Sequence, residues 1–301
     1  MIDINGKTTI YGIIGDPITH SLSPLFQNYF LSTVGLNSTY LPFCVKPEKL
    51  SQALKGLHAA HIEGLNITVP HKESAMIDVQ ADQDAITIGA INTVKRTNEG
   101  WSATNTDWQG FSSVLHGLNA NVANTPVLIF GAGGTARAIC HALHKEGAKE
   151  ILICNRSSQR AEKLASDLQS NYSSMEIKLI AWSEEEVAEH LKGCKVIINT
   201  SAIGLNDDDT FPFELIGSGY AIDVVYKPSG HTAFVTAAGN GGFMPVDGLP
   251  MLLAQGITAF AYWHSDALNS NNFDLPDKLE SLHWVEKQLA RQPLSLPGWR
   301  T

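Results

Sequence analysis

The sequence has 301 residues, a net charge of −9 and 44% hydrophobic residues, which fits a soluble globular protein of two ordinary domains. It contains no Lys/Arg-rich run, no basic segment followed by an apolar leader and no apolar run of membrane-spanning length. We therefore expect no nucleic-acid partner, no membrane partner and a cytoplasmic location. The four cysteines lie far apart and three of them fall in apolar runs, which predicts buried, reduced thiols.

The first hundred residues alternate strand and helix patterns, which favours a parallel sheet. The expected strands are residues 8–16, 39–45 and 63–70. The expected helices are residues 23–35, residues 47–60 and a third helix beginning in residues 71–80. Ser23 can cap the first of these helices. An antiparallel hairpin with its turn at residues 98–100 is expected to follow.

A second alternating series starts at residue 126. Its expected strands are residues 126–130, 150–155, 177–182, 195–201 and 219–226, and its expected helices are residues 135–147 and 158–170. An apolar helix over residues 249–264 and one amphipathic helix in the tail complete the chain. We predict an α/β fold of two α/β domains. Residues 1–106, completed by C-terminal helices in 248–301, form a substrate domain, and residues 107–247 form a Rossmann-like dinucleotide-binding domain with a parallel sheet.

The segment "GAGGTARA" at residues 131–138 lies between an expected strand and an expected helix. Gly131 permits a tight turn, Gly133 lets phosphates approach the backbone, and the small Ala136 lets the helix pack on the sheet. The helix N-terminus then faces the anion. This context predicts a pyrophosphate site rather than a glycine-rich turn without a ligand.

The end of the following strand reads "CNRSSQR" and carries no acidic residue. A site selective for NAD places Asp or Glu there to bond the ribose 2′-hydroxyl. Guanidinium groups suit a phosphate instead, so we predict NADP as the cofactor. The cofactor residues expected in this stretch are Asn155, Arg156, Ser157 and Arg160.

Several polar residues of the first domain lie where strands are expected to end, and ligands of open α/β sheets bind beyond those ends. Their hydroxyls, amides, single cation and single carboxylate suit a polyhydroxylated carboxylate. These residues are Ser21, Ser23, Asn66, Thr68, Lys72, Asn92 and Asp107. From spacing alone, Asp107 could equally be a helix cap and Lys72 a surface lysine.

Eight ordered strings in residues 10–265 resemble the shikimate dehydrogenase family. They are "GDPITHSLSP", "NITVPHK", "GAINTV", "NTDWQG", "FGAGGTARA", "NRS", "DVVYKP" and "DGLPMLLAQ". The resemblance implies reversible, NADP-linked reduction of 3-dehydroshikimate to shikimate, a step of chorismate and aromatic amino acid biosynthesis. It implies a small-molecule substrate, and the chain is expected to be a monomer or a homodimer.

The resemblance also implies a role for each matching residue. Ser21 and Ser23 bind the substrate carboxylate, while Thr68, Asn92, Asp107 and Gln255 hold ring hydroxyls. Lys72 and Asp107 are the catalytic pair, and Tyr226 lies near the substrate. The cofactor residues implied are Gly131, Ala132, Gly133, Gly134, Thr135, Asn155, Arg156 and Arg160, with Thr200, Ser201, Val224 and Gly248 at the nicotinamide end.

The sequence departs from the family pattern at two positions and leaves several points open. Ser201 stands where the family has threonine, and Gly256 stands inside a helix where the family has alanine. Open points are whether Lys72 or Asp107 moves the proton, and what the tail after residue 270 does. Two other functions remain: a quinate/shikimate dehydrogenase with broader substrate or NAD use, and a non-catalytic NADP(H)-binding sensor. The pairs His58/His61 and His141/His144 lack a third ligand nearby, so no metal site is expected.

Overall fold

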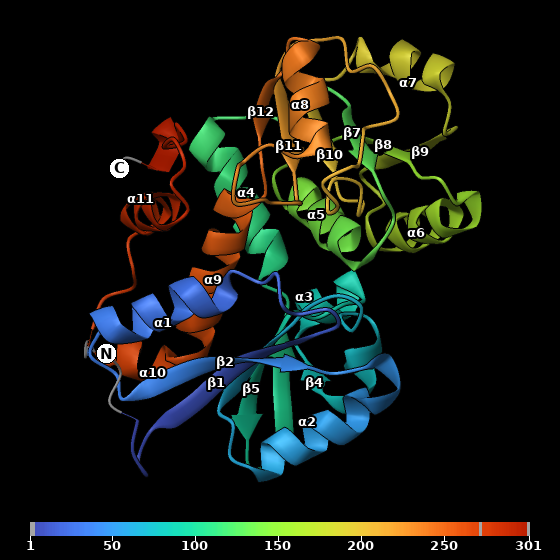
Figure 1. The fold of residues 1–301 in the computed structure, drawn as a ribbon. Coiled ribbons are helices and arrows are strands. Elements are labelled where there is room, and N and C mark those ends of the chain that lie inside the picture. The colour runs from blue at the N-terminus through green and yellow to red at the C-terminus, as the bar shows by residue number, and fades with distance from the viewer. Residues whose placement is uncertain (1–3, 271–272, 300–301) are drawn as a thin grey trace. The chain divides into compact units, whose positions relative to one another are not determined.

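The computed structural model describes residues 4–270 and 273–299, and the chain divides into two compact units. Unit 1 comprises Met1–Asp107 and Leu253–Ser281, and unit 2 comprises Trp108–Leu252 and Leu282–Thr301. Each unit has its own sheet with helices packed against it (Figure 1). The predicted α/β fold with two α/β units is therefore confirmed. None of the described helices is long and apolar enough to cross a membrane.

The described part of unit 1 contains a mixed six-stranded sheet in the order β2-β1-β3-β5-β6-β4. Its strands are β1 (Thr9–Gly15), β2 (Ser38–Cys44), β3 (Gly64–Ile67), β4 (Gln80–Ala81), β5 (Thr93–Thr97) and β6 (Gly100–Thr104). Strand β1 runs parallel to β2 and β3, whereas β5 and β6 form the expected antiparallel hairpin. Strand β5 also pairs antiparallel with β3, which joins the hairpin to the parallel part.

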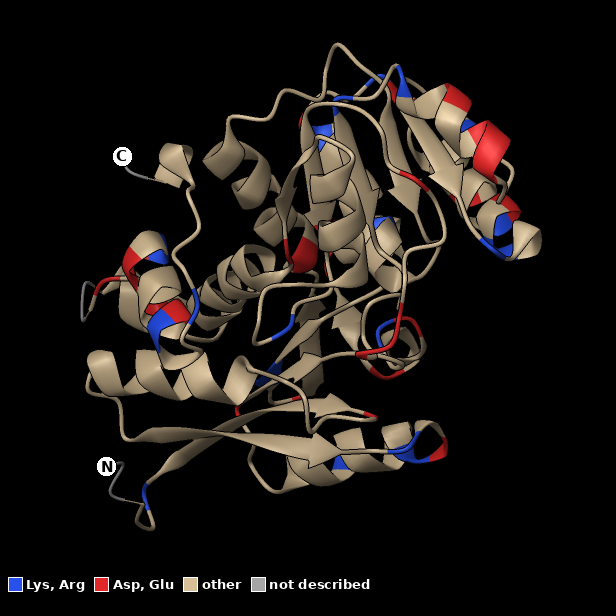
Figure 2. Cartoon of the chain, turned by 45° about the horizontal axis from the view of Figure 1, so that its top comes forward, with Lys and Arg blue, Asp and Glu red and all other residues tan. Residues whose placement is uncertain are grey.

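Helices cover both faces of this sheet (Figure 1). They are α1 (Ser23–Thr33), α2 (Leu50–Ala59), α3 (Gln83–Ile88), α9 (Leu249–Trp263) and α10 (Ser265–Asn269), with the 3₁₀ turns η1 (Pro47–Lys49) and η2 (Ser74–Asp78). On one face, Leu50 and Leu54 of α2 enter a buried apolar cluster with the strands. On the other face, the Trp263 indole of α9 donates to the Val94 carbonyl at 3.0 Å. Neither α1 nor α9 carries a charged residue (Figure 2), as expected for helices packed against apolar neighbours.

The described part of unit 2 contains a six-stranded sheet in the order β12-β11-β10-β7-β8-β9, with every neighbouring pair parallel. The strands are β7 (Val127–Phe130), β8 (Glu150–Cys154), β9 (Glu176–Ile180), β10 (Val196–Asn199), β11 (Tyr220–Asp223) and β12 (Met244–Val246). The helices are α4 (Asp107–Leu118), α5 (Gly134–Lys145), α6 (Ser158–Asn171), α7 (Glu184–Leu191), α8 (Ala233–Asn240) and α11 (Lys278–Gln288), followed by the turn η3 (Pro297–Trp299). Sequence analysis did not identify β12, α7, α8 or α10.

Two local expectations were wrong. Residues 71–80 do not begin an α-helix: they form the 3₁₀ turn η2, and extended Val79 then leads into β4. The next helix, α3, starts only after Asp82, whose carboxylate accepts a bond from the Ala85 N–H. Ser23 is not the cap of α1 either. Leu22 holds the N-cap position, and its side chain makes no capping hydrogen bond.

The C-terminal tail belongs structurally with unit 2 from Leu282 onward, whereas the whole of 248–301 was expected with the first domain. The reason is local packing: the Trp299 indole donates to the Ser113 carbonyl of α4 at 2.7 Å. Its ring also lies against Gly117, where a Cβ would come within 2.7 Å of the indole nitrogen. A glycine at that position is what allows the tail to lie flat on α4.

Candidate active site

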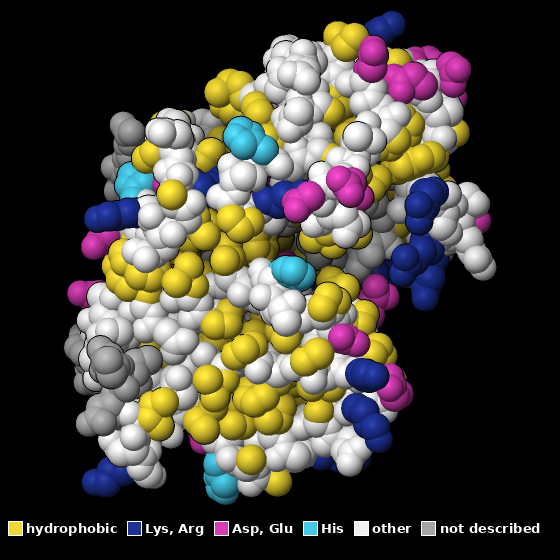
Figure 3. Space-filling view, viewed as in Figure 1, with side chains coloured by type: hydrophobic (Ala, Val, Ile, Leu, Met, Phe, Trp, Pro, Cys, Tyr) yellow, Lys and Arg dark blue, Asp and Glu magenta, His cyan; other side chains and the backbone are white. Residues whose placement is uncertain are grey.

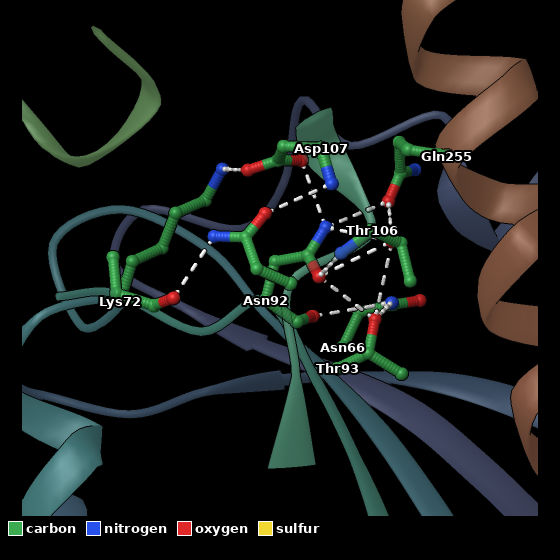
Figure 4. Close-up of polar contacts among 9 residues, drawn as sticks. Asn66, Lys72, Asn92, Thr93, Thr106, Asp107 and Gln255 are labelled. Carbon is green, nitrogen blue, oxygen red and sulfur yellow. Dashed lines mark hydrogen bonds and ion pairs between the residues drawn. The ribbon is translucent and has the colours of Figure 1, made fainter. Parts of the chain in front are cut away.

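An ion pair between Lys72 and Asp107 lies in unit 1 (Figure 4). The distance from Lys72 Nζ to Asp107 Oδ2 is 2.6 Å, and the two side chains are 13% and 7% exposed. Lys72 follows β3, and its carbonyl accepts from the Ile91 N–H at 2.9 Å, which ties this loop to the segment entering β5. Asp107 is the first residue of α4. Two segments separated in sequence thus bring one cation and one carboxylate together.

Asn92 is the centre of the hydrogen-bond network around this pair (Figure 4). Its amide nitrogen lies 2.8 Å from Asp107 Oδ1, 2.9 Å from Thr106 Oγ1 and 3.1 Å from Gln255 Oε1. Its side-chain oxygen Oδ1 accepts from the Thr106 N–H at 2.7 Å. Because Asn92 is buried, these bonds fix the orientation of the Asp107 carboxylate and leave its Oδ2 to Lys72.

Asn66 lies at the base of the same network, and its side chain is committed to internal bonds. The Tyr40 hydroxyl donates to Asn66 Oδ1 at 2.7 Å. The Asn66 side-chain amide donates to Thr93 Oγ1 at 3.1 Å and to the Asn92 backbone carbonyl at 3.3 Å. These contacts connect β2, β3 and β5, so Asn66 supports the site from within the sheet.

Sequence reasoning did not single out Tyr40, Thr93 or Thr106 of this network. Thr93 and Thr106 are fully buried, and both hydroxyls donate to Asn92 Oδ1. Both lie inside the quoted strings "GAINTV" and "NTDWQG", so the motifs contained the signal although only their neighbours were singled out. Tyr40 lies outside every quoted string, and only the structure reveals it.

His71 holds the Lys72 loop in place. Its ring is fully buried, and Nε2 donates to the Val45 carbonyl at 2.7 Å. Since Val45 follows β2, the bond ties the loop after β3 to the loop after β2.

The remaining substrate candidates are divided between the units. In unit 1, Ser21 precedes α1, and Ser23 is the first residue of that helix. Ser21 Oγ accepts from the Ser23 N–H at 3.2 Å, and Ser23 is buried. Thr68 is half-buried directly after β3. Tyr226 is half-buried and belongs to unit 2, in the loop after β11.

The glycine turn of unit 2 has the geometry that a dinucleotide requires. Gly131 has φ +115°, and a Cβ there would lie 2.4 Å from Thr200 Oγ1, so only glycine fits. A Cβ at Gly133, by contrast, would meet nothing within 4 Å, which leaves room in front of the turn. Helix α5 begins at Gly134 and presents its N-terminus there. Ala132, Gly134 and Thr135 are all half-buried in this turn, so the residues present fit a pyrophosphate.

The turn after β8 presents the two arginines to solvent. Arg156 and Arg160 are exposed, and no acidic residue follows the strand. Ser157 caps α6 by accepting from the Arg160 N–H, and the Asn155 amide donates to the Ser157 carbonyl at 2.8 Å. This turn can therefore present guanidinium groups to a phosphate on a well-ordered backbone.

The hydroxyls of Thr200 and Ser201 form bonds within the protein. Thr200 Oγ1 donates to the Phe130 carbonyl at 2.9 Å. Ser201 Oγ donates to Asn199 Oδ1 at 2.6 Å and accepts from the Ile203 N–H at 3.2 Å. The hydroxyl kept at the position of the family threonine thus shapes the loop after β10.

Val224 and Gly248 follow β11 and β12, next to each other at the same sheet edge. The Gly248 N–H donates to the Val225 carbonyl at 2.9 Å. A Cβ at Gly248 would lie 2.2 Å from the Val224 carbonyl oxygen. Beside them, burial raises the pKa of Asp223 to about 7, although Thr232, Val225 and Asn199 all donate to its carboxylate.

The histidine pairs considered for metal make other contacts. His58 bonds the Thr97 carbonyl at 2.9 Å, and His141 bonds the Tyr172 hydroxyl at 2.7 Å. His144 stacks on the Tyr172 ring. Over residues 4–270 and 273–299, no group of three or more His, Cys, Asp or Glu side chains is arranged to hold a metal ion.

An apolar hollow lies on unit 1, away from the polar network. Hydrophobic side chains gather over β2 and α2 (Figure 3). The hollow is lined by Pro42, Phe43, Cys44, Val45, Ala53, Gly56 and Leu57. Since none of the predicted site residues lies in its lining, it is separate from the candidate active site.

Comparison with known proteins matches both halves of the chain. Residues 13–94 match the family described as shikimate dehydrogenase substrate binding domain, and residues 114–203 match the family described as shikimate / quinate 5-dehydrogenase. The chain is 41% identical over 266 residues to the shikimate dehydrogenase (NADP(+)) of Aquifex aeolicus, covering 87% of this chain and 93% of that protein.

Solved structures agree with this match. Shikimate 5-dehydrogenase from Thermus thermophilus, in complex with NADP(H) and shikimate, superposes with a TM-score of 0.78 at 30% identity, covering 94% of this chain and 100% of that chain. The enzyme from Listeria monocytogenes, in complex with shikimate and NAD, gives a TM-score of 0.78 at 29% identity, covering 90% and 98%.

Proposed function

The chain belongs to the shikimate dehydrogenase family, and from that premise we propose that it catalyses the reversible, NADP-dependent reduction of 3-dehydroshikimate to shikimate. This reaction is a step of chorismate and aromatic amino acid biosynthesis. The observation that carries the proposal is the pair of Lys72 and Asp107 at 2.6 Å within a network of amides and hydroxyls. Such a network suits a ring that bears several hydroxyl groups.

Lys72 and Asp107 form the catalytic pair in this proposal. Oxidising shikimate removes one proton from a ring hydroxyl and one hydride from the carbon that bears it. Bound NADP supplies the acceptor for the hydride. The hydroxyl proton passes to the Lys72–Asp107 pair, and in the reductive direction the pair returns it to the ketone oxygen. Asn92 holds the Asp107 carboxylate so that its Oδ2 faces Lys72.

The other substrate residues bind and orient the ring. Ser21 and Ser23, at the start of α1, take the carboxylate, and Thr68, Asn92, Asp107 and Gln255 take ring hydroxyls. Tyr226, in the loop after β11, is also assigned to the substrate. Asn66 acts indirectly, because its amide and carbonyl groups are bonded to Tyr40, Thr93 and Asn92.

NADP is assigned to unit 2. The turn from Gly131 to Thr135 takes the pyrophosphate, and Asn155, Arg156, Ser157 and Arg160 take the 2′-phosphate region. Thr200, Ser201, Val224 and Gly248 define the nicotinamide end. The exposed Arg156 and Arg160 at the end of β8 support NADP over NAD.

We also propose a cytoplasmic enzyme that is a monomer or a homodimer and has no nucleic-acid or membrane partner. Three free thiols support a reducing compartment. Cys140, Cys154 and Cys194 are buried, and desolvation raises the pKa of each to about 12. Cys44 is the exposed cysteine of the four.

One assay distinguishes the proposed function from its alternatives. The purified protein is given shikimate with NADP, and reduced nicotinamide is followed by absorbance. Parallel reactions contain NAD in place of NADP, or quinate in place of shikimate. Turnover with shikimate and NADP is expected. Preference for quinate with NAD would favour the broader dehydrogenase, and absence of turnover with every pair would favour an NADP(H)-binding sensor.

Replacing Lys72 tests the role of the pair. Lys72→Ala is expected to lower kcat by about 10²- to 10⁴-fold with little change in KM for shikimate, because it removes a proton-transfer group. Lys55→Ala, an exposed lysine on α2, is the matched control and should leave both constants unchanged. A Lys72→Ala variant with near-normal kcat and raised KM would make Lys72 only a binding residue.

A further inference from the structure

We propose that Arg291, in the C-terminal tail, is a positioning residue for the cofactor: its ion pair with Asp247 fixes the loop that carries Gly248 and thereby the place of the nicotinamide end. This inference rests on the proposed function for the identity of the cofactor. No sequence motif pointed to Arg291, and the tail had no assigned role.

The first observation is the geometry of the pair. Arg291 Nη1 lies 3.0 Å from Asp247 Oδ2, and Nη2 lies 3.0 Å from Asp247 Oδ1. The two side chains are 6% and 1% exposed. Both carboxylate oxygens are thus engaged by one planar guanidinium, which fixes orientation as well as distance. A lysine could not reproduce this two-point contact.

The second observation is that Asp247 joins the loops at the carboxyl edge of the unit 2 sheet. It directly follows β12, and the N–H of Leu249, which begins α9, donates to its Oδ1 at 3.4 Å. The backbone of Lys227, next to Tyr226, also bonds the carboxylate. Asp247 therefore connects the exit of β12 to the loop after β11.

Gly248 lies between these attachments. Its N–H is held by the Val225 carbonyl, and there is no space for a side chain between Gly248 and Val224. A small rotation of the Asp247 backbone would move Gly248 directly. Ligands of parallel sheets bind beyond the carboxyl ends of the strands, so this movement would shift the nicotinamide end of the bound cofactor.

The third observation is that the tail is built to present Arg291. The Arg291 N–H donates to the Glu286 carbonyl at 2.9 Å. Glu286 is itself buried, and its Oε1 accepts from the Leu294 N–H at 2.8 Å, closing the chain around Arg291. The guanidinium also lies against Gly230, where a Cβ would come within 2.9 Å of Nη2.

Binding of two ligands separates positioning from general support. NADPH contains the nicotinamide, whereas adenosine 2′,5′-bisphosphate carries only the half of NADP that is assigned to the turn after β8. The variants are the double replacement Arg291→Met with Asp247→Asn, which removes both charges of the pair, and the single Arg291→Lys. Lys178→Met with Glu150→Gln, an ion pair between β9 and β8, is the matched control.

The double variant is expected to bind NADPH at least about tenfold more weakly and to bind adenosine 2′,5′-bisphosphate within about twofold of wild type. A tenfold change corresponds to about 1.4 kcal/mol of binding free energy. The kcat should fall while KM for shikimate stays unchanged. Arg291→Lys keeps the charge without the planar fork, so its affinity for NADPH should lie between those of wild type and the double variant. This single variant decides the question if the double variant does not fold.

Equal weakening of both ligands would overturn the proposal, because it would show only a structural role, and so would unchanged binding of NADPH. The control pair should change neither ligand. Wild-type protein that binds NADPH but does not oxidise shikimate would refute the proposed reaction and leave the binding comparison valid. Wild-type protein that binds no NADPH would refute both.

Discussion

The two units hold the C-terminal part of the chain by chemically different means. Unit 1 holds α9 with neutral contacts: a missing Cβ at Gly256, a bond from the Gln27 amide to the Gly256 carbonyl at 2.9 Å, and the indole bond of Trp263. Unit 2 holds its tail with buried charge, the ion pair of Arg291 and Asp247. Neutral packing tolerates a change of pH, whereas buried carboxylates do not, since their protonation alters the free energy of folding.

The difference extends to other buried groups. In unit 2, burial raises the pKa of Asp223, Asp247 and Glu286, and the charges of Asp223 and Asp247 act on each other. In unit 1, burial lowers the pKa of His264, which lies among the rings of Tyr11, Phe260 and Phe273. The two units should therefore lose stability at opposite ends of the pH range.

The largest effect is expected in unit 2 on replacing Asp223. Burial raises the pKa of Asp223 from 3.8 to about 7, so the folded state keeps a proton that the unfolded state has already lost. This stabilisation is fully present below about pH 4 and is lost as pH rises to about 7. Each pKa unit is worth about 1.4 kcal/mol. Asp223→Asn should remove roughly 4 kcal/mol of this pH dependence.

This pH dependence is measured by urea unfolding at several pH values, with fluorescence as the signal. The free energy of unfolding of wild type relative to Asp223→Asn should fall steadily between about pH 4 and about pH 7. Asp208→Asn, an exposed aspartate of the same unit, should run parallel to wild type. A flat difference between wild type and Asp223→Asn would contradict the prediction, because it would show that the three donors around Asp223 fully offset its desolvation.

Sequence patterns predicted that Lys72, Asn92 and Asp107 of unit 1 lie together, but they predicted nothing about the ion pair of Arg291 and Asp247 in unit 2. Lys72, Asn92 and Asp107 each lie at a strand or helix end, where alternation and local motifs place them at one sheet edge. Arg291 and Asp247 are 44 residues apart, and neither periodicity nor a motif marks a pairing at that distance. Tertiary packing alone decides it.

The same limit applies to short elements. Residues 71–80 have apolar residues that suit a helix, yet the extended Val79 and the pairing of β4 with β6 interrupt it. Strand β12 is only Met244–Val246, and its sequence carries no alternation long enough to detect. By contrast, the long apolar helix α9 was correctly predicted in place.

A smaller effect is expected on filling the close contact in unit 1. A Cβ at Gly256 would lie 2.4 Å from the ring of Phe26, which is fully buried on α1. Gly256→Ala should therefore destabilise the protein by roughly 2 kcal/mol, the overpacking cost less the gain in helix propensity. Thermal unfolding measures this, and Phe26→Leu in the same chain should restore part of the loss.

The control for this variant is expected to have the opposite effect on stability. Gly56 lies in α2, and a Cβ there would meet nothing within 4 Å, so Gly56→Ala should stabilise by about 0.5–1 kcal/mol. If Gly256→Ala also stabilised the protein, α1 and α9 would be less tightly packed than the structure shows. Packing would then not explain why Gly256 stands where the family pattern has alanine.

The smallest effect is expected at His264, and it completes the comparison because its sign is opposite to that of Asp223. Burial lowers the pKa of His264 to about 4, so the folded state resists a proton that the unfolded state accepts near about pH 6.5. Stability is present above that pH and is lost as pH falls to about 4. Because the ring is only partly buried, solvent screening reduces the effect to about 1 kcal/mol.

His264→Phe should make the acid side of the stability profile flatter, while the profile above about pH 7 keeps its shape. The phenyl ring fits the same aromatic neighbours and removes Nε2, which is buried without a hydrogen-bond partner. His231→Phe, at an exposed position of unit 2, is the control and should leave the acid side unchanged. An acid side equally steep in His264→Phe would mean that carboxylates, rather than this histidine, set the stability of unit 1 at low pH.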